Sequence, residues 1–104
     1  MAYKHVDKYH YFISEGIQQK AYIGCWKGST FQGYIDFFEP EDLQSPGINS
    51  NGSFHLSYPI ERLDAIISML REESPVYIYV YQSGGNYRCR ITTSNEPVGE
   101  EEGH

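Results

Sequence analysis

Residues 76–81 read Val-Tyr-Ile-Tyr-Val-Tyr, and this stretch decides the fold because aliphatic and tyrosine side chains alternate along it. A repeat of two is that of a β-strand, in which successive side chains point to opposite faces of the sheet. One face of the predicted strand is therefore aliphatic, and the other carries phenol rings. We expect an amphipathic helix before this strand and a tight turn after it, so the central unit is helix, strand, turn, strand.

The segment 59–73 has the pattern of an amphipathic helix. Its apolar residues recur at intervals of three and four positions and form one stripe, and charged residues occupy the opposite face. Pro59 suits the first turn of a helix, and Pro75 ends the helix just before the strand. The apolar stripe consists of Ile60, Leu63, Ile66, Ile67 and Leu70.

Two consecutive glycines, Gly84 and Gly85, predict a two-residue hairpin turn after the strand. The resulting register joins aliphatic residues on one face and tyrosine to arginine on the other. The predicted partners are Val80 with Cys89, Ile78 with Ile91, Tyr81 with Arg88, and Tyr79 with Arg90. We expect the aliphatic face to pack on the helix and the rings and guanidinium groups to point away from it.

Four strands are expected before the helix, at residues 9–13, 19–26, 30–38 and 53–58, because these segments are rich in aromatic and β-branched types. Residues 1–8 are polar and mixed and carry no prediction, whereas 45–53 is a loop dense in glycine, asparagine, serine and proline. The sequence therefore predicts an α+β fold. We expect an antiparallel β-sheet of about five or six strands with one main α-helix packed on one face, in the order ββββαββ.

The length of 104 residues and the distribution of charge predict one domain followed by an acidic tail. The net charge is −6, but four of the negative charges are glutamates in residues 96–104, so residues 1–95 carry only −2. We expect a single domain over residues 1–95 and a flexible, solvated tail over 96–104. The tail either keeps a tyrosine-rich sheet soluble, or competes for a basic surface or docks on a partner.

The sequence has no segment typical of membrane insertion or secretion. No apolar run approaches the ~20 residues that cross a bilayer, and the N-terminus lacks the apolar core of a signal peptide, so we expect a cytoplasmic protein without a membrane partner. Cys25 and Cys89 lie in strand-like stretches and are interpreted as buried thiols. The four histidines are scattered without ligand spacing. We therefore expect no metal site and no cofactor.

The face of the last hairpin that points away from the helix has the two ingredients of a surface for single strands of nucleic acid, at Tyr77, Tyr79, Tyr81, Arg88 and Arg90. Aromatic rings stack on bases with on the order of 1 to 3 kcal/mol per base, and cations contact phosphates. Trp26, with Tyr22 and Lys27, extends this surface if the second strand shares the sheet. Alternatively, these side chains only cover a half-exposed sheet or pack against a second subunit.

An enzymatic function is not expected. Asp36, Glu39, His10 and His55 are able to meet in the fold, but they have no mutual spacing that marks a catalytic group. The glycine pair at 84–85 has no helix after it, so it is not a phosphate-binding loop. A small-molecule site would require a ligand-sized pocket between sheet and helix.

The order of elements resembles a known family. Four strands followed by a helix, over residues 9–73, are similar to the ββββα unit of Whirly-type single-stranded-DNA-binding domains, which assemble as dimers or larger rings. The resemblance rests on topology and helix placement, without a signature motif, so it assigns no role to any residue. It implies binding of single-stranded DNA and self-association. The tyrosine-rich hairpin after the helix and the acidic charge depart from the family pattern.

Two hypotheses for the function follow. The first is a non-enzymatic binding module for single-stranded nucleic acid that uses the tyrosine and arginine face. The second is a protein-interaction or oligomerisation domain in which the tyrosine face is buried between subunits. A homodimer is expected in either case, because one helix of about 15 residues cannot cover a sheet of this size.

Overall fold

Residues 3–93 are described by the computed structural model, and they form eight strands and one α-helix. The strands are β1 (Tyr3–Val6), β2 (Lys8–Ile13), β3 (Ala21–Lys27), β4 (Thr30–Phe38), β5 (Gly47–Ile48), β6 (Phe54–Pro59), β7 (Val76–Ser83) and β8 (Asn86–Thr92). A 3-10 turn, η1 (Pro40–Asp42), follows β4, and a second, η2 (Ile60–Arg62), leads into the helix α1 (Leu63–Glu72). The predicted tail at 96–104 lies outside the described residues.

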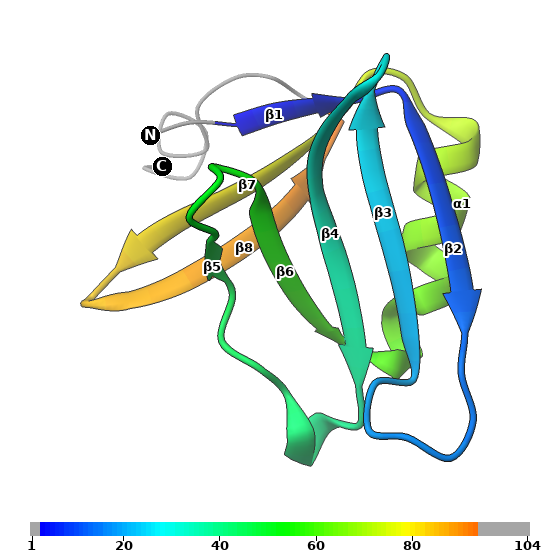
Figure 1. Cartoon of the computed structure of the whole chain (residues 1–104), viewed down its shortest axis with the longest axis vertical. Helices are drawn as coiled ribbons and strands as arrows, with labels where there is room; N and C mark the ends of the chain where they lie inside the picture. The colour runs from blue at the N-terminus through cyan, green and yellow to red at the C-terminus, as the bar shows by residue number, and fades with distance from the viewer. Residues whose placement is uncertain (1–2, 94–104) are drawn as a thin grey trace.

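The elements are arranged in two layers (Figure 1). One layer is a five-stranded sheet in the order β2-β3-β4-β6-β5. The other layer consists of a three-stranded sheet, β1-β7-β8, and of α1, which lie side by side on the inner face of the five-stranded sheet. The predicted α+β class, with strands predominating and one helix packed on them, is confirmed.

The register of the last hairpin agrees with the sequence. Val80 pairs with Cys89 and Ile78 with Ile91, and the two tyrosine and arginine pairs occur as expected. Gly84 and Gly85 have φ angles of 62° and 85°, the left-handed conformation that a tight hairpin turn of this type requires.

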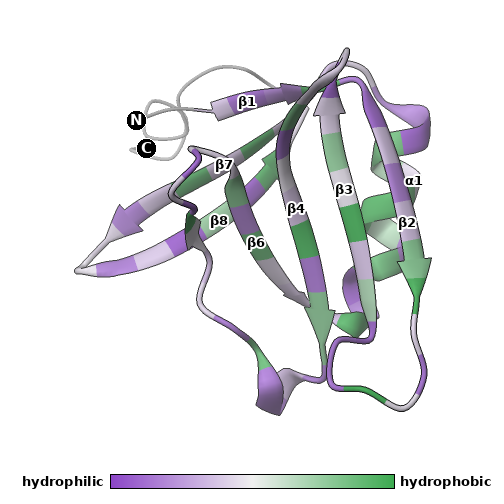
Figure 2. Cartoon of the chain, viewed as in Figure 1, coloured by the Kyte–Doolittle hydropathy of each residue, from purple (hydrophilic) through white to green (hydrophobic). Residues whose placement is uncertain are grey.

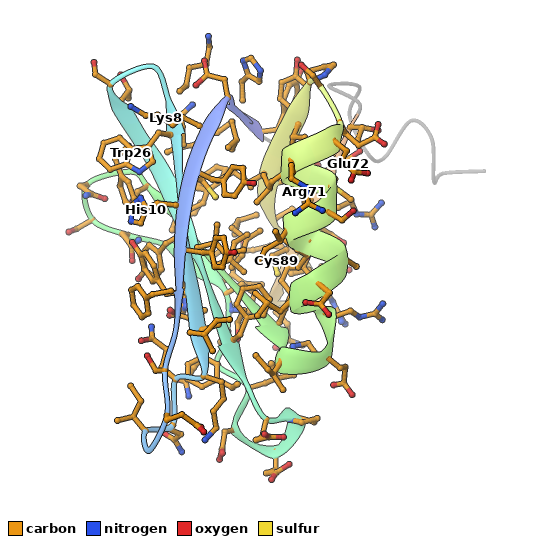
Figure 3. All side chains as sticks on the ribbon, turned by 90° about the vertical axis from the view of Figure 1, so that its right-hand side faces the viewer. Lys8, His10, Trp26, Arg71, Glu72 and Cys89 are labelled. Carbon is orange, nitrogen blue, oxygen red and sulfur yellow. The ribbon has the colours of Figure 1, made fainter. Side chains whose placement is uncertain are left out.

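The core lies between the two layers. Ile23, Ile35 and Leu56 of the five-stranded sheet are fully buried, as is Ile78 of β7. The helix contributes Leu63 and Ile66, and Ile60, Ile67 and Leu70 of the predicted stripe pack around them. Figure 2 shows hydrophobic residues on the side of α1 that faces the sheet, and Figure 3 shows side chains filling the space between α1 and the strands.

The structure differs from the expected arrangement in the pairing of distant strands. β4 and β6 run parallel, because residues 39–53 between them form a connection long enough to return the chain to the other end of the sheet. β5 then forms a short hairpin with β6.

The N-terminal residues form the strand β1, for which the sequence carries no prediction. β1 pairs with β7 and places Tyr3 opposite Tyr79. The chain then crosses from the three-stranded to the five-stranded sheet at Asp7. The Asp7 N–H donates to the Trp26 carbonyl, and its carboxylate accepts from the Gly28 N–H, both at 2.9 Å. Asp7 therefore fastens the corner where the two sheets meet.

Candidate nucleic-acid interface

The outer side of the three-stranded sheet carries most of the residues predicted to bind. We call this side the tyrosine–arginine face. Because β7 is the central strand, β1 supplies neighbours on one side of its tyrosines and β8 supplies arginines on the other. The face consists of Tyr3, His5, Tyr77, Tyr79, Tyr81, Arg88 and Arg90.

The rings of this face contact one another and are exposed to different extents. Tyr77 is edge-on to Tyr3, with ring centroids 5.2 Å apart, and Tyr79 stacks on Tyr81 at 5.0 Å. Tyr79 is only 2% exposed, whereas Tyr77 and Tyr81 are half-buried and Arg88 is exposed. Burial raises the pKa of the Tyr79 phenol, Tyr81 adds to that increase and Arg90 opposes it. A ligand on this face would therefore meet Tyr77, Tyr81 and Arg88 before Tyr79.

The three-stranded sheet is positively charged although the chain as a whole is acidic. Strands β1, β7 and β8 contain Lys4, Arg88 and Arg90 but no aspartate or glutamate. Lys4 lies at the inner edge of the sheet, where its Nζ atom is 5.1 Å from the centre of the Phe54 ring. The negative charges of residues 3–93 therefore lie outside the three strands that carry the tyrosine–arginine face.

Trp26 and Lys27 lie in β3, in the five-stranded sheet, and therefore do not extend the tyrosine–arginine face. The predicted extension required β3 to share a sheet with β7 and β8, and β3 belongs to the other sheet. Lys27 Nζ lies 4.0 Å from an oxygen of Asp7, and Lys8 Nζ lies 5.7 Å from the centre of the Trp26 ring. In Figure 3 Trp26 points away from α1, from the outer side of its own sheet.

The outer side of the five-stranded sheet carries a second aromatic surface that sequence reasoning missed. Four rings on four adjacent strands stack in a row, which we call the aromatic ladder: Phe12, Tyr22, Tyr34 and His55. Their successive centroid distances are 5.0, 5.7 and 4.9 Å. Each strand shows its own aromatic residue in the sequence, but only the pairing of β2, β3, β4 and β6 brings them into one row.

One of the candidate catalytic pairs, Asp36 and His55, does meet, beside the end of this ladder. His55 Nε2 lies 3.0 Å from Asp36 Oδ2, but it is not aligned for a hydrogen bond. The Gln19 side chain donates to the other oxygen of Asp36. Ser57, opposite Asp36 in the register, uses its hydroxyl to accept from the Gln44 N–H at 3.1 Å. The group explains how a largely buried carboxylate is accommodated among aromatic rings, and it contains no activated nucleophile.

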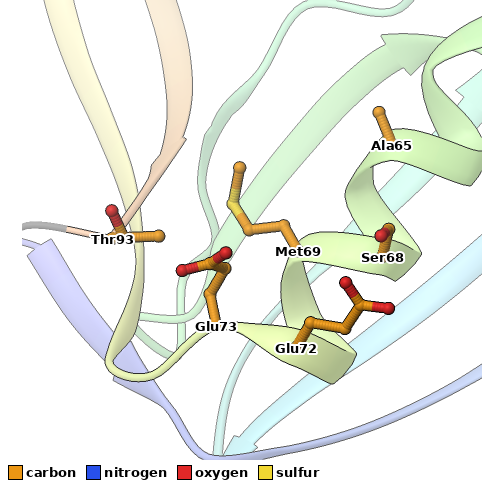
Figure 4. A pocket seen from close by; sticks show the side chains of 6 residues that line it. All are labelled: Ala65, Ser68, Met69, Glu72, Glu73 and Thr93. Atoms are coloured by element: carbon orange, nitrogen blue, oxygen red, sulfur yellow. The ribbon is translucent and has the colours of Figure 1, made fainter.

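Two cavities lie beside α1. The first, of about 350 Å³, is near the lower limit for small-molecule sites and is lined by Tyr58, Pro59, Arg62, Ala65, Ile66, Met69 and Ile91. The second, of about 510 Å³, is an open depression at the C-terminal end of the helix (Figure 4). It is lined by Ala65, Ser68, Met69, Glu72, Glu73 and Thr93. Neither cavity includes a residue of the tyrosine–arginine face.

Comparison with known proteins adds no family. The chain matches no protein-family model, and no curated protein and no solved structure resembles it significantly. Within residues 3–93, no helix has the length and apolar character needed to span a membrane. The same residues contain no cluster of three or more histidine, cysteine, aspartate or glutamate side chains arranged to hold a metal ion. The functional argument therefore rests on the surfaces described above.

Proposed function

We propose that this domain is a non-enzymatic binding module for single-stranded nucleic acid, and that it binds through the tyrosine–arginine face. The observation that carries the proposal is the register of β7 and β8, which places Tyr81 beside Arg88 and Tyr79 beside Arg90 on the outer side of one sheet. The opposite side of the same strands is held in the core by Ile78 and Val80.

The chemistry of the face suits this ligand. Bases stack on tyrosine rings largely without regard to their identity, with on the order of 1 to 3 kcal/mol per base. Arginine side chains next to the rings neutralise phosphates and release counterions, which makes the affinity depend on salt. Strands β1, β7 and β8 contain no carboxylate, so the repulsion of phosphates at the face itself is weaker than the net charge of −6 implies.

The test is a titration of short, labelled single-stranded oligonucleotides at low and at moderate salt, followed by fluorescence anisotropy. We expect binding that weakens steeply with salt and that is lost in Tyr81→Ala and in Arg88→Ala. Tyr87→Ala is the matched control for the ring, because Tyr87 lies on β8 with its side chain on the opposite side of the sheet. Arg71→Ala is the matched control for the charge, because Arg71 is an exposed residue of α1.

The intrinsic fluorescence of Trp26 separates this face from the aromatic surface of the other sheet. Trp26 lies in β3, so binding to the tyrosine–arginine face leaves its emission largely unchanged. Strong quenching of Trp26, together with full affinity in Tyr81→Ala, would move the site to the five-stranded sheet. No binding at low salt would refute the function itself.

The second hypothesis is a protein-interaction domain that buries the tyrosine–arginine face between subunits, and one observation weighs against base stacking over the whole of this face. Tyr79 is 2% exposed and its ring is already stacked on Tyr81, so this part of the face offers little free ring surface to a base. If the hypothesis holds, Tyr81→Ala lowers the mass of the particle in solution and oligonucleotides have no effect on it.

A further inference from the structure

Within residues 3–93, the two sheets have four edge strands, β1, β8, β2 and β5. These four strands differ in how their edges are protected. An unpaired edge is able to pair with another chain, and proteins prevent this with charged side chains or very short strands. β8 carries Arg88 and Arg90, β1 has four residues including Lys4, and β5 has only two residues. β2 has six residues, of which only Lys8 is charged, and it contains no proline. β2 is therefore the unprotected edge.

Exposed apolar side chains occur on both faces of β2 and in the loop that follows it. Tyr11, Phe12, Ile13 and Ile17 are 47%, 45%, 65% and 52% exposed, and they make up four of the eight exposed large hydrophobic residues in the described part of the chain. Clusters of this kind on a protein surface mark interaction sites. The edge of β2 thus combines free backbone groups with apolar surface.

The hydrogen bonds around β2 indicate which of its backbone groups point outward. In an antiparallel pair, alternate residues direct both N–H and C=O at the partner strand, and the residues between them direct these groups away. At the end of the strand the Ser14 N–H donates to the Lys20 carbonyl at 2.9 Å, in continuation of the β2–β3 register. Even-numbered residues therefore bond to β3, and Tyr9, Tyr11 and Ile13 present their backbone groups at the open edge.

We propose that a second copy of this chain pairs with β2 in antiparallel orientation, about a two-fold axis beside Tyr11. In this register Tyr11 lies opposite Tyr11 of the second copy, and Tyr9 lies opposite its Ile13. All outward backbone groups of the strand are then paired, by about six hydrogen bonds between the two chains. The two five-stranded sheets become one continuous sheet, and the two-fold axis closes the assembly at two copies.

The side chains of β2 favour its own copy as the partner. On the outer side, Phe12 lies opposite His10 of the second copy, so the aromatic ladder continues across the axis. In this register Lys8, the charged residue of β2, lies opposite the neutral Ser14 of the second copy, whereas an in-register parallel pairing would place Lys8 opposite Lys8. Glu15, beyond the end of the strand, lies opposite Asp7, where the chain has already turned toward the three-stranded sheet.

The first test is the mass of the full chain by sedimentation equilibrium. We expect a dimer of the 12.0 kDa chain, and we expect Ile13→Lys to raise its dissociation constant at least about tenfold by placing a charge on the paired edge. Ile48→Lys is the matched control, because Ile48 lies on the other edge of the same sheet with 52% exposure. That variant should remain as dimeric as the wild type.

The second test fixes the register. Residues that exchange hydrogen bonds across an antiparallel pair have Cα atoms about 5.5 Å apart, within the range of about 4.4 to 6.8 Å that suits a disulfide. Tyr11→Cys should therefore form a crosslinked dimer under mild oxidation. Ile13→Cys should not, because the two copies of that residue are about 13 Å apart along the strands. The wild type, with Cys25 buried and Cys89 half-buried, is the uncrosslinked control.

The outcomes separate this inference from the proposed function. A wild-type chain that stays monomeric at every concentration, or a dimer unaffected by Ile13→Lys, overturns the inference. Crosslinking of Ile13→Cys but not of Tyr11→Cys refutes the register. A dimer lost only in Tyr81→Ala places the interface on the tyrosine–arginine face instead. Loss of oligonucleotide binding in Tyr81→Ala with an unchanged mass leaves the β2 interface standing.

Discussion

At the scale of single residues, the close approach of the two layers depends on a position without a side chain. A Cβ atom added to Gly33 of β4 would lie 2.4 Å from the Phe54 carbonyl oxygen and 3.0 Å from Ile78 Cδ1. The first of these atoms belongs to the backbone of the neighbouring strand and cannot move away cheaply. Gly33 therefore lets β6 and the side chain of Ile78 pack against β4.

We expect Gly33→Ala to destabilise the fold by about 1 to 3 kcal/mol, the usual cost of overpacking a core. Gly47→Ala is the control, because a Cβ atom at Gly47 would meet no atom within 4 Å. Urea unfolding monitored by circular dichroism measures both variants. Equal midpoints for Gly33→Ala and the wild type would show that β4 and β6 are less tightly packed than described.

The sequence allowed the strand around Gly33 to be predicted with its correct bounds, but not the role of the glycine. The content of aromatic and β-branched residues in 30–38 is a local property, whereas the approach of Phe54 depends on the pairing of two segments joined by a long connection. The same limit applies to the aromatic ladder, whose members are obvious singly and are related only by the order of the strands.

At the scale of elements, the last hairpin is the part that its sequence specifies most completely. The turn contributes two glycines, and the strands contribute a regular alternation, so turn and pattern require the same register. β1 is the opposite case. It is four residues long, its composition is polar and mixed, and its partner β7 lies at the far end of the chain, so no local signal identifies it.

The turn provides a test of this element. Gly85 has a φ of 85°, where a residue with a Cβ atom costs roughly 1–2 kcal/mol, so Gly85→Ala should lower the free energy of unfolding by that amount. Gly84→Asn should be nearly neutral, because asparagine is favoured at the first position of such turns. Thermal unfolding of both variants compares them directly. A harmless Gly85→Ala would mean that the turn adopts another conformation.

At the scale of the whole molecule, the sequence predicted which residues share the outer side of the hairpin but not which strands join it. The tyrosine–arginine face follows from one local register. The membership of Trp26 depends on whether β3 enters the same sheet, which is decided by competition among all strands. The division into two sheets is therefore a property of the complete chain, and local patterns did not reveal it.

Stability of the whole molecule should decrease at alkaline pH, because several buried acids are held neutral. Burial raises the pKa of the Cys25 thiol from 9.0 to about 12, and burial also raises the pKa values of Cys89 and Tyr58. Below the pKa of the unfolded state these groups are neutral in both states, and the stability is complete. As the pH rises above that value the groups ionise in the unfolded state first, so stability is lost. Between its unfolded and its folded pKa, each group lowers the free energy of unfolding by about 1.4 kcal/mol per pH unit.

Urea unfolding over a pH series tests this expectation. The free energy of unfolding should be constant up to about pH 8 with respect to these groups and should fall above pH 9.0, where the unfolded Cys25 thiol ionises. Cys25→Ala should show a shallower alkaline decrease, although its stability at neutral pH is lower because of the cavity it leaves. An unchanged alkaline slope in that variant would contradict the assignment to Cys25.

The pairing of β1 with β7 also sets an order of events in folding. Val6 lies opposite Val76, so the three-stranded sheet joins segments from the two ends of the described chain, whereas β2, β3 and β4 form successive hairpins. Contacts between distant segments form late because closing a long loop costs entropy first. On a ribosome, β1 has no partner until β7 has been synthesised. The part of the tyrosine–arginine face that β1 supplies, Tyr3 and His5, would therefore be completed only after β7 has emerged, later than the hairpins of β2, β3 and β4.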